Sequence, residues 1–167
     1  MASSSSSSKT GLKKMLTLKS SDGDEFELEE SIVIQCQTIK HMVEDGFSLI
    51  PLQNVDTKTL TKIIEYMKKH AEKTESNKEE IKNFNKEFVK GSFDDQFELV
   101  SAANYLHING LMDLLCQSIA DRINNKSVRA VREIFNISND YTPDEEEKVR
   151  DEHKWAHEGG EFDESLD

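Results

Sequence analysis

Apolar positions recur with a helical period over residues 92–125. Those of the first run are Phe93, Phe97, Leu99, Val100, Ala103 and Leu106, and those of the second are Leu111, Leu114, Leu115, Ile119 and Ile123. Because an α-helix turns once every 3.6 residues, this spacing predicts two amphipathic helices. The short connection at residues 107–110 predicts that they pack as a helical hairpin. Two interpretations stay open: a plain helical core, or a core with one face kept for a partner.

Shorter patterns near the start of the chain predict a small sheet. Residues 15–18 suit a strand, residues 20–24 contain an Asp-Gly turn signal, and residues 25–28 alternate between polar and apolar. Residues 49–52 predict a third strand, and Pro51 places it at an edge because proline has no backbone N–H to donate. A hairpin alone is marginally stable in water. The chain is therefore predicted to be α+β, with a small sheet packed on a helical cluster.

Further helices are predicted between the strands and the central pair. The first part of residues 31–45 contains a β-branched run, so its pattern does not decide between strand and helix. The apolar residues of the second half recur with a helical period. Asp56 is a suitable N-cap for a helix over residues 57–73. Residues 73–80 are entirely polar and predict a solvated linker, and residues 81–88 predict a short helix after it.

The pattern changes after residue 125. Residues 128–135 predict a short helix with Ser127 as its N-cap. A stronger helix start follows at Thr142, which can cap the helix while Pro143 fits the first helical position. Glu145 can reach back to Thr142 and complete a capping box.

The helix that this start predicts, over residues 144–158, is almost entirely polar. Its only sizeable apolar side chains are Val149 and Trp155. Burying Trp155 would contribute about 2–3 kcal/mol, too little to order so acidic a helix firmly. Two interpretations stay open: a frayed, solvated helix, or a helix that becomes ordered against a partner with Trp155 as its anchor.

Charge and composition narrow the possible partners. The chain has 167 residues and a net charge of −12, and residues 138–167 hold twelve acids against three Lys or Arg, a net of −9. This field disfavours nucleic acid and anionic membranes as partners. Residues 1–12 are rich in serine and predict disorder. The N-terminus has no apolar signal core and no segment is long enough for a membrane span, which predicts a nuclear and cytoplasmic protein.

The candidate chemistry is sparse. Cys36 and Cys116 lie in separate apolar runs and predict reduced, buried thiols. No nucleotide-binding glycine motif, P-loop or nucleophile elbow is present. Among the histidines only His153 and His157 have ligand-like spacing, and the position after His153 is lysine instead of the glutamate of a zinc-protease motif. The sequence therefore predicts no enzyme, no cofactor and no metal site.

Several motifs in order resemble one family. They are residues 21–23 (SDG), 51–55 (PLQNV), 97–106 (FELVSAANYL) and 135–143 (FNISNDYTP), followed by the helix that ends near Trp155. They resemble the Skp family, the adaptors of SCF-type ubiquitin ligases, and most closely its plant members. The resemblance covers about residues 14–158. It implies a BTB/POZ-type fold over residues 13–124, two additional C-terminal helices within residues 125–158, and an acidic tail at residues 159–167.

The resemblance also implies partners and contact residues. A non-enzymatic adaptor of this kind bridges a cullin and F-box substrate receptors for protein ubiquitination and degradation. The match implies cullin contacts at Asn104 and Tyr105. It implies an F-box surface between about residues 102 and 157. The residues it places there are Leu111, Leu115, Ile119, Val131, Phe135, Ile137, Val149 and Trp155.

Some positions depart from the family pattern. A proline that usually starts the helix after Ser127 is absent, Arg129 brings a positive charge into its first turn, and a common tryptophan is Phe84. These changes could alter which F-box proteins the chain prefers to bind. A diverged, self-associating BTB-like scaffold is the alternative function. The same exposed surface could support a weak homodimer of the free adaptor.

Overall fold

The N-terminal part of the chain forms a three-stranded sheet. Strands β1 (Met15–Lys19) and β2 (Glu25–Glu29) form an antiparallel hairpin, in which Leu16 lies opposite Leu28. Strand β3 (Leu49–Pro51) pairs with β1 in parallel, so the sheet order is β2-β1-β3. The hairpin and the edge position of β3 are as predicted, because Pro51 needs no ladder donor there.

The structure, a computed structural model, describes residues 14–157 and 162–167. Helices make up most of it outside the sheet. The helices are α1 (Glu30–Val33), α2 (Gln37–Glu44), α3 (Thr57–Ala71), α4 (Lys78–Phe88), α5 (Phe93–Leu106), α6 (Asn109–Ile123), α7 (Val128–Ile134) and α8 (Pro143–Glu152), with short 3-10 turns at Glu75–Asn77 and Lys154–His157. Strands followed by a helical cluster confirm the predicted α+β class.

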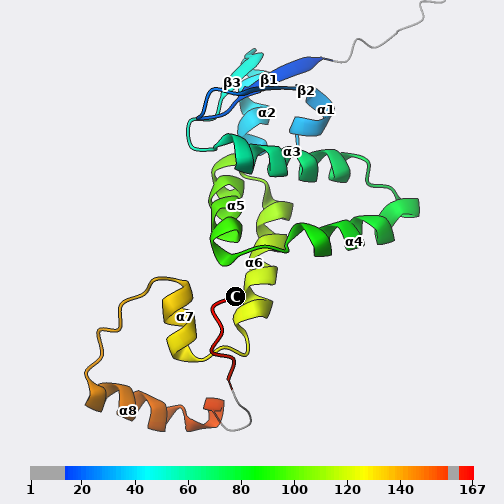
Figure 1. The fold of residues 1–167 in the computed structure, drawn as a ribbon. Coiled ribbons are helices and arrows are strands. Elements are labelled where there is room, and N and C mark those ends of the chain that lie inside the picture. The colour runs from blue at the N-terminus through cyan, green and yellow to red at the C-terminus, as the bar shows by residue number, and fades with distance from the viewer. Residues whose placement is uncertain (1–13, 158–161) are drawn as a thin grey trace, which may run out of the picture.

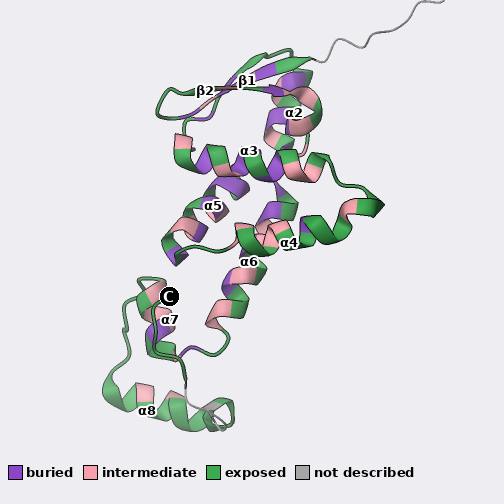
Figure 2. Ribbon diagram, turned by 45° about the vertical axis from the view of Figure 1, so that its right-hand side comes forward, coloured by how far each residue is buried: buried purple, intermediate pink, exposed green. Residues whose placement is uncertain are grey.

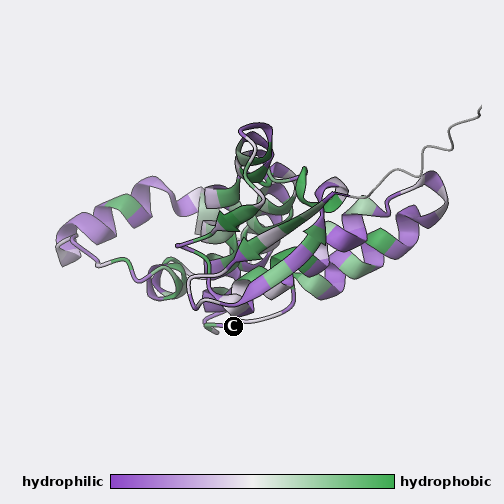
Figure 3. Ribbon diagram, turned by 90° about the horizontal axis from the view of Figure 1, so that it is seen from above, coloured by the Kyte–Doolittle hydropathy of each residue, from purple (hydrophilic) through white to green (hydrophobic). Residues whose placement is uncertain are grey.

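The core lies between the sheet and the central helices. Helix α3 crosses beneath the sheet, and α5 and α6 lie side by side below it (Figure 1). Hydrophobic residues are concentrated where these layers overlap (Figure 3). Among the largest fully buried apolar side chains are Leu16, Leu18, Ile39, Ile50, Leu52, Leu60, Ile63, Met67, Leu106, Leu111 and Leu115. The alternation of the strands thus buries one face of the sheet against helices.

Local signals explain where the central helices begin and end. The Ser92 hydroxyl accepts a hydrogen bond from the Asp95 N–H, which caps α5. His107 ends α5 in the left-handed conformation, with φ of 53°. Only His107 and Ile108 separate α5 from α6, so the predicted helical hairpin is confirmed with a shorter connection than residues 107–110.

Three sequence-based predictions need correction. Helix α4 begins at Lys78, so the predicted linker over residues 73–80 is partly helical. Helix α8 ends at Glu152 and is followed by a 3-10 turn, so it is shorter than predicted. Cys36 is buried, but Cys116 is exposed, because it falls on the outer face of α6. The predictions for residues 1–12 and for a helix stop at residues 159–160 lie outside the described residues.

The C-terminal helices α7 and α8 extend away from the core (Figure 1). Most of their residues are exposed (Figure 2). Helix α7 buries only Ala130, and no residue of α8 is buried. This end of the molecule therefore gains little from the hydrophobic effect, as the polar pattern of the last helix predicted.

Candidate partner-binding surfaces

Exposed apolar side chains lie on the two C-terminal helices and on the segments that directly follow each of them. Trp155 is 74% exposed, Ile137 56% and Phe135 37%, while Val131 and Val149 are half-buried. These five residues, which we call the α7–α8 face, all belong to the predicted F-box surface. Large apolar side chains with this much exposure on one part of a protein are typical of a contact surface.

The predicted F-box residues on α6 lie elsewhere. Leu111 and Leu115 are fully buried in the core, and Ile119 is 9% exposed. Their spacing placed them on one apolar helix face, which the fold buries in the core beside α5. In the free chain Leu111, Leu115 and Ile119 are therefore buried, and the exposed part of the predicted surface is the α7–α8 face.

Specific local contacts position α7. The Ser127 hydroxyl accepts a hydrogen bond from the Ala130 N–H at 3.0 Å, as predicted for an N-cap. At the other end, the Phe135 ring lies 5.1 Å from the ring of Phe97 on α5. This aromatic contact ties the end of α7 to the central helices. Arg129 projects into solvent and pairs with Glu133 one turn later.

Helix α8 is positioned mainly by polar contacts. Thr142 and Glu145 form the predicted capping box, which lowers the pKa of the Glu145 carboxyl through the hydrogen bonds with Thr142. Arg132 on α7 donates to Glu146 on α8 at 2.9 Å, and this ion pair is partly buried. The two C-terminal helices are therefore linked through charge more than through apolar packing.

The acidic tail contributes a contact that the sequence patterns did not indicate. The side chain of Lys126 is 1% exposed and its Nζ donates to the Asp163 carboxylate at 2.8 Å and to the Ser165 carbonyl at 2.7 Å. A backbone bridge pairs Lys126 with Asp163, and the Ser127 hydroxyl donates to Glu164. The end of the chain is thus held beside the start of α7 (Figure 1).

The predicted cullin contacts lie on a different part of the molecule. Asn104 is exposed near the end of α5, and Tyr105 beside it is half-buried. The Tyr105 carbonyl accepts a hydrogen bond from the Thr38 hydroxyl at 3.1 Å, which ties α5 to α2. The same hydroxyl lies 3.2 Å from His107 Nδ1. The Asn104 side chain remains available on this surface.

The described residues offer no group of three or more His, Cys, Asp or Glu side chains placed to hold a metal ion. The His153 ring lies 6.4 Å from the Trp155 ring, edge to face. Within the same residues, no helix is long and apolar enough to cross a membrane.

Comparison with known proteins identifies the family. A model of the Skp1 family dimerisation domain matches residues 109–156, and a model of the Skp1 family tetramerisation domain, the POZ part, matches residues 14–72. The chain belongs to the Skp1 family. This result confirms the BTB/POZ-type fold that the resemblance implied, and it supports the SCF adaptor role.

Plant members of the Skp1 family are similar over nearly their whole length. SKP1-like protein 4 of Arabidopsis thaliana is 48% identical over 159 residues, which cover 87% of this chain and 98% of that protein. SKP1-like protein 11 of the same plant is 50% identical over 149 residues, with the same coverage. SKP1-like protein 1 of Oryza sativa subsp. japonica is 45% identical over 169 residues, covering 89% of this chain and 98% of that protein.

Proposed function

We propose that this chain is the non-enzymatic adaptor subunit of an SCF-type ubiquitin ligase. It holds the N-terminal domain of a cullin through the surface around Asn104 and Tyr105, and an F-box protein through the α7–α8 face. The substrate bound by the F-box protein is thereby brought to the subunits that transfer ubiquitin. Membership of the Skp1 family supports this role, and no cofactor is required for it.

The observation that carries the proposal is the α7–α8 face. Its most exposed side chain is Trp155, in the turn after α8. The helices that carry or precede these residues bury almost nothing of their own. An F-box helix packed on this face would remove that apolar area from water, which is the main favourable contribution to such an interface. The acidic residues around it would favour a basic partner and raise the association rate.

The proposed surfaces for the two partners are separate, as an adaptor that binds both at once requires. Asn104 and Tyr105 lie on α5 near α2, whereas the α7–α8 face lies at the other end of the molecule (Figure 1). Neither surface shares a residue with the other. The cullin and the F-box protein can then bind at the same time, and each contact can be disrupted without the other.

Calorimetric titration of the full chain with an isolated F-box domain tests the proposal. We expect one-to-one binding with a large negative heat-capacity change, because apolar surface is buried. A second titration of the preformed complex with a cullin N-terminal domain should give a ternary complex. Failure to bind several different F-box domains, with the chain folded by circular dichroism, would contradict the adaptor role and favour a self-associating BTB-like scaffold.

We also propose that the protein occurs in the nucleus and the cytoplasm, as expected from the sequence. Imaging of a fluorescent fusion in plant cells, with free fluorescent protein as the reference, measures the distribution. Exclusion from either compartment would contradict this expectation.

A further inference from the structure

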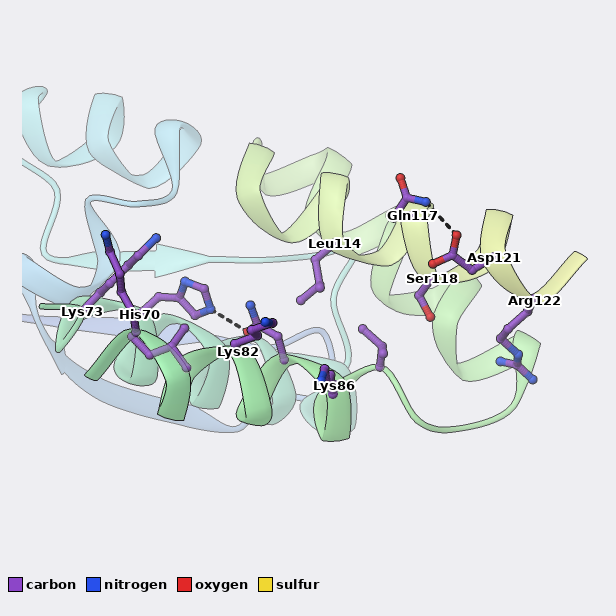
Figure 4. Close-up of a pocket in the computed structure, with 13 residues that line it drawn as sticks. His70, Lys73, Lys82, Lys86, Leu114, Gln117, Ser118, Asp121 and Arg122 are labelled. Carbon is purple, nitrogen blue, oxygen red and sulfur yellow. Dashed lines mark hydrogen bonds between the residues drawn. The ribbon is translucent and has the colours of Figure 1, made fainter. Parts of the chain in front are cut away.

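A groove lies between α4 and α6, closed at one end by the last turn of α3 and the residues after it. Its volume is about 710 Å³, and Figure 4 shows side chains from both helices lining it. None of the residues proposed to contact a cullin or an F-box protein lines this groove. The family role therefore leaves it unexplained.

The helical repeat of α4 gives the groove an apolar floor and a basic rim. Lys78, Lys82 and Lys86 are spaced four residues apart, so they follow one another along a single face of the helix. Ile81, which is 3% exposed, lies on the adjoining row, and Leu114 lines the groove from α6. Apolar side chains thus form the floor while ammonium groups line one edge.

The charge of this edge is largely uncompensated. Lys82 and Lys86 form no ion pair with any of the described residues, and Lys78 pairs only with the exposed Glu75. By contrast, Lys69 and Lys90, which do not line the groove, each pair with a glutamate of α4. In a chain of net charge −12, this edge is a local concentration of positive charge.

The opposite wall is mostly occupied by internal contacts. Asp121, the acid in the wall, accepts a hydrogen bond from Gln117 at 2.8 Å. Arg122 donates to the Gly91 carbonyl and to Gln96, each at 3.0 Å, and its guanidinium lies 3.8 Å from the centre of the Phe93 ring. The cations left for a ligand are therefore those of α4, together with Lys73 beyond α3.

We propose that the α4–α6 groove is a binding site for an amphipathic organic anion. The ligand carries a phosphate or carboxylate, which the ammonium groups of Lys82 and Lys86 pair with, on an apolar body that covers the half-buried Leu114 beside the buried Ile81. The volume falls within the range of about 300–1,000 Å³ that small-molecule pockets occupy. An apolar floor with a few charged groups at its edge is also the usual composition of such sites. This site is independent of the adaptor role.

An NMR titration of the full-length, ¹⁵N-labelled chain with octyl phosphate tests the proposal. We expect saturable shifts of backbone amides in α4 and α6, including those of Ile81 and Leu114. Octanoate replaces the phosphate by a carboxylate, and comparison of the two ligands shows which anion is preferred. Inorganic phosphate and the uncharged octyl glucoside should each bind at least about tenfold more weakly, because each supplies only half of the interaction.

Charge-reversal variants locate the site. The double variant Lys82→Glu/Lys86→Glu should weaken octyl phosphate binding at least about tenfold, because two attractions become repulsions. The matched control is Lys40→Glu, which reverses an exposed lysine on α2 outside the groove and should change the affinity less than about twofold. Circular dichroism confirms that each variant is folded.

Three results would overturn the proposal. Shifts confined to the α7–α8 face would show that octyl phosphate binds exposed apolar surface there instead. Unchanged affinity in the double variant would show that the lysines do not hold the anion. Equal or tighter binding of a short polyglutamate peptide, with the same shifts, would show that this edge recognises acidic protein segments and not a small amphipathic anion.

Discussion

Replacing Trp155 by alanine separates partner binding from folding. A fully enclosed tryptophan buries about 150–250 Å², and Trp155 is 74% exposed in the free chain, so roughly 150 Å² remains for a partner to cover. At about 25 cal/mol per Å², this area is worth at most about 4 kcal/mol. Side-chain ordering and incomplete burial reduce the gain, so we expect a loss of about 2 kcal/mol, or roughly 30-fold in Kd.

Calorimetry with an isolated F-box domain measures this loss. The melting temperature of Trp155→Ala should stay within a few degrees of the parent, because an exposed side chain contributes little to folding. Trp155→Phe keeps part of the apolar area and should recover part of the affinity. Phe47→Ala is the matched control, since Phe47 is 58% exposed on the turn between α2 and β3 and should leave F-box binding unchanged. Equal affinity for the parent and Trp155→Ala would refute the assignment of Trp155 as an anchor.

Three other predictions concern separate parts of the molecule. The double variant Asn104→Lys/Tyr105→Lys should lose affinity for a cullin N-terminal domain by about tenfold or more while binding an F-box domain normally; loss of both activities in a folded protein would contradict separate surfaces. A thiol reagent at pH 8 should label the exposed Cys116 and spare Cys36, whose pKa burial raises to about 11, until the chain is denatured; rapid labelling of both in the native protein would contradict the buried position. The hydrogen bond from the buried Lys126 lowers the pKa of the Asp163 carboxyl below its usual 3.8. The tail should therefore stay docked at pH values above 3.8, and it should detach only at lower pH, where the Asp163 carboxylate of the folded protein becomes protonated. Amide shifts of the last six residues should therefore stay constant from pH 7 to pH 5 and resemble those of Asp163→Asn only at lower pH; undocking near pH 6 would show that another group controls the tail.

Features that depend on a few neighbouring residues could be predicted from the sequence. Asp56, Ser127 and Thr142 each cap the helix that the pattern assigned to them, because capping involves only the residue and the next turn. The hairpin and the edge strand with Pro51 follow from equally local constraints. Periodicity likewise identified the two central helices, whose apolar faces are long enough to be unambiguous.

Features that depend on distant segments could not be predicted in this way. Periodicity shows that Leu111 and Leu115 share a face, but only the packing of α6 on α5 within the core shows that this face is internal. From its sequence neighbours Lys126 would be expected to lie on the surface. Its side chain is buried because it contacts residues 163–165, almost forty positions later. Polar composition also misled the interpretation of residues 78–80, where an acidic first turn stabilises the start of α4 instead of a linker.

The weak internal packing of the C-terminal helices connects the fold to the proposed function. Helix α7 reaches the core through the Phe97–Phe135 contact, and the Arg132–Glu146 pair links it to α8. A partly buried ion pair near the surface adds only about 1 kcal/mol, and the helices bury almost no apolar side chains. They should therefore open at lower free energy than the core. A partner that binds only their ordered form must supply that ordering energy, and it also stabilises them in proportion to its concentration. Slower amide exchange in α7 and α8 on F-box binding, with the sheet unchanged, is therefore the result that an adaptor of this construction should give.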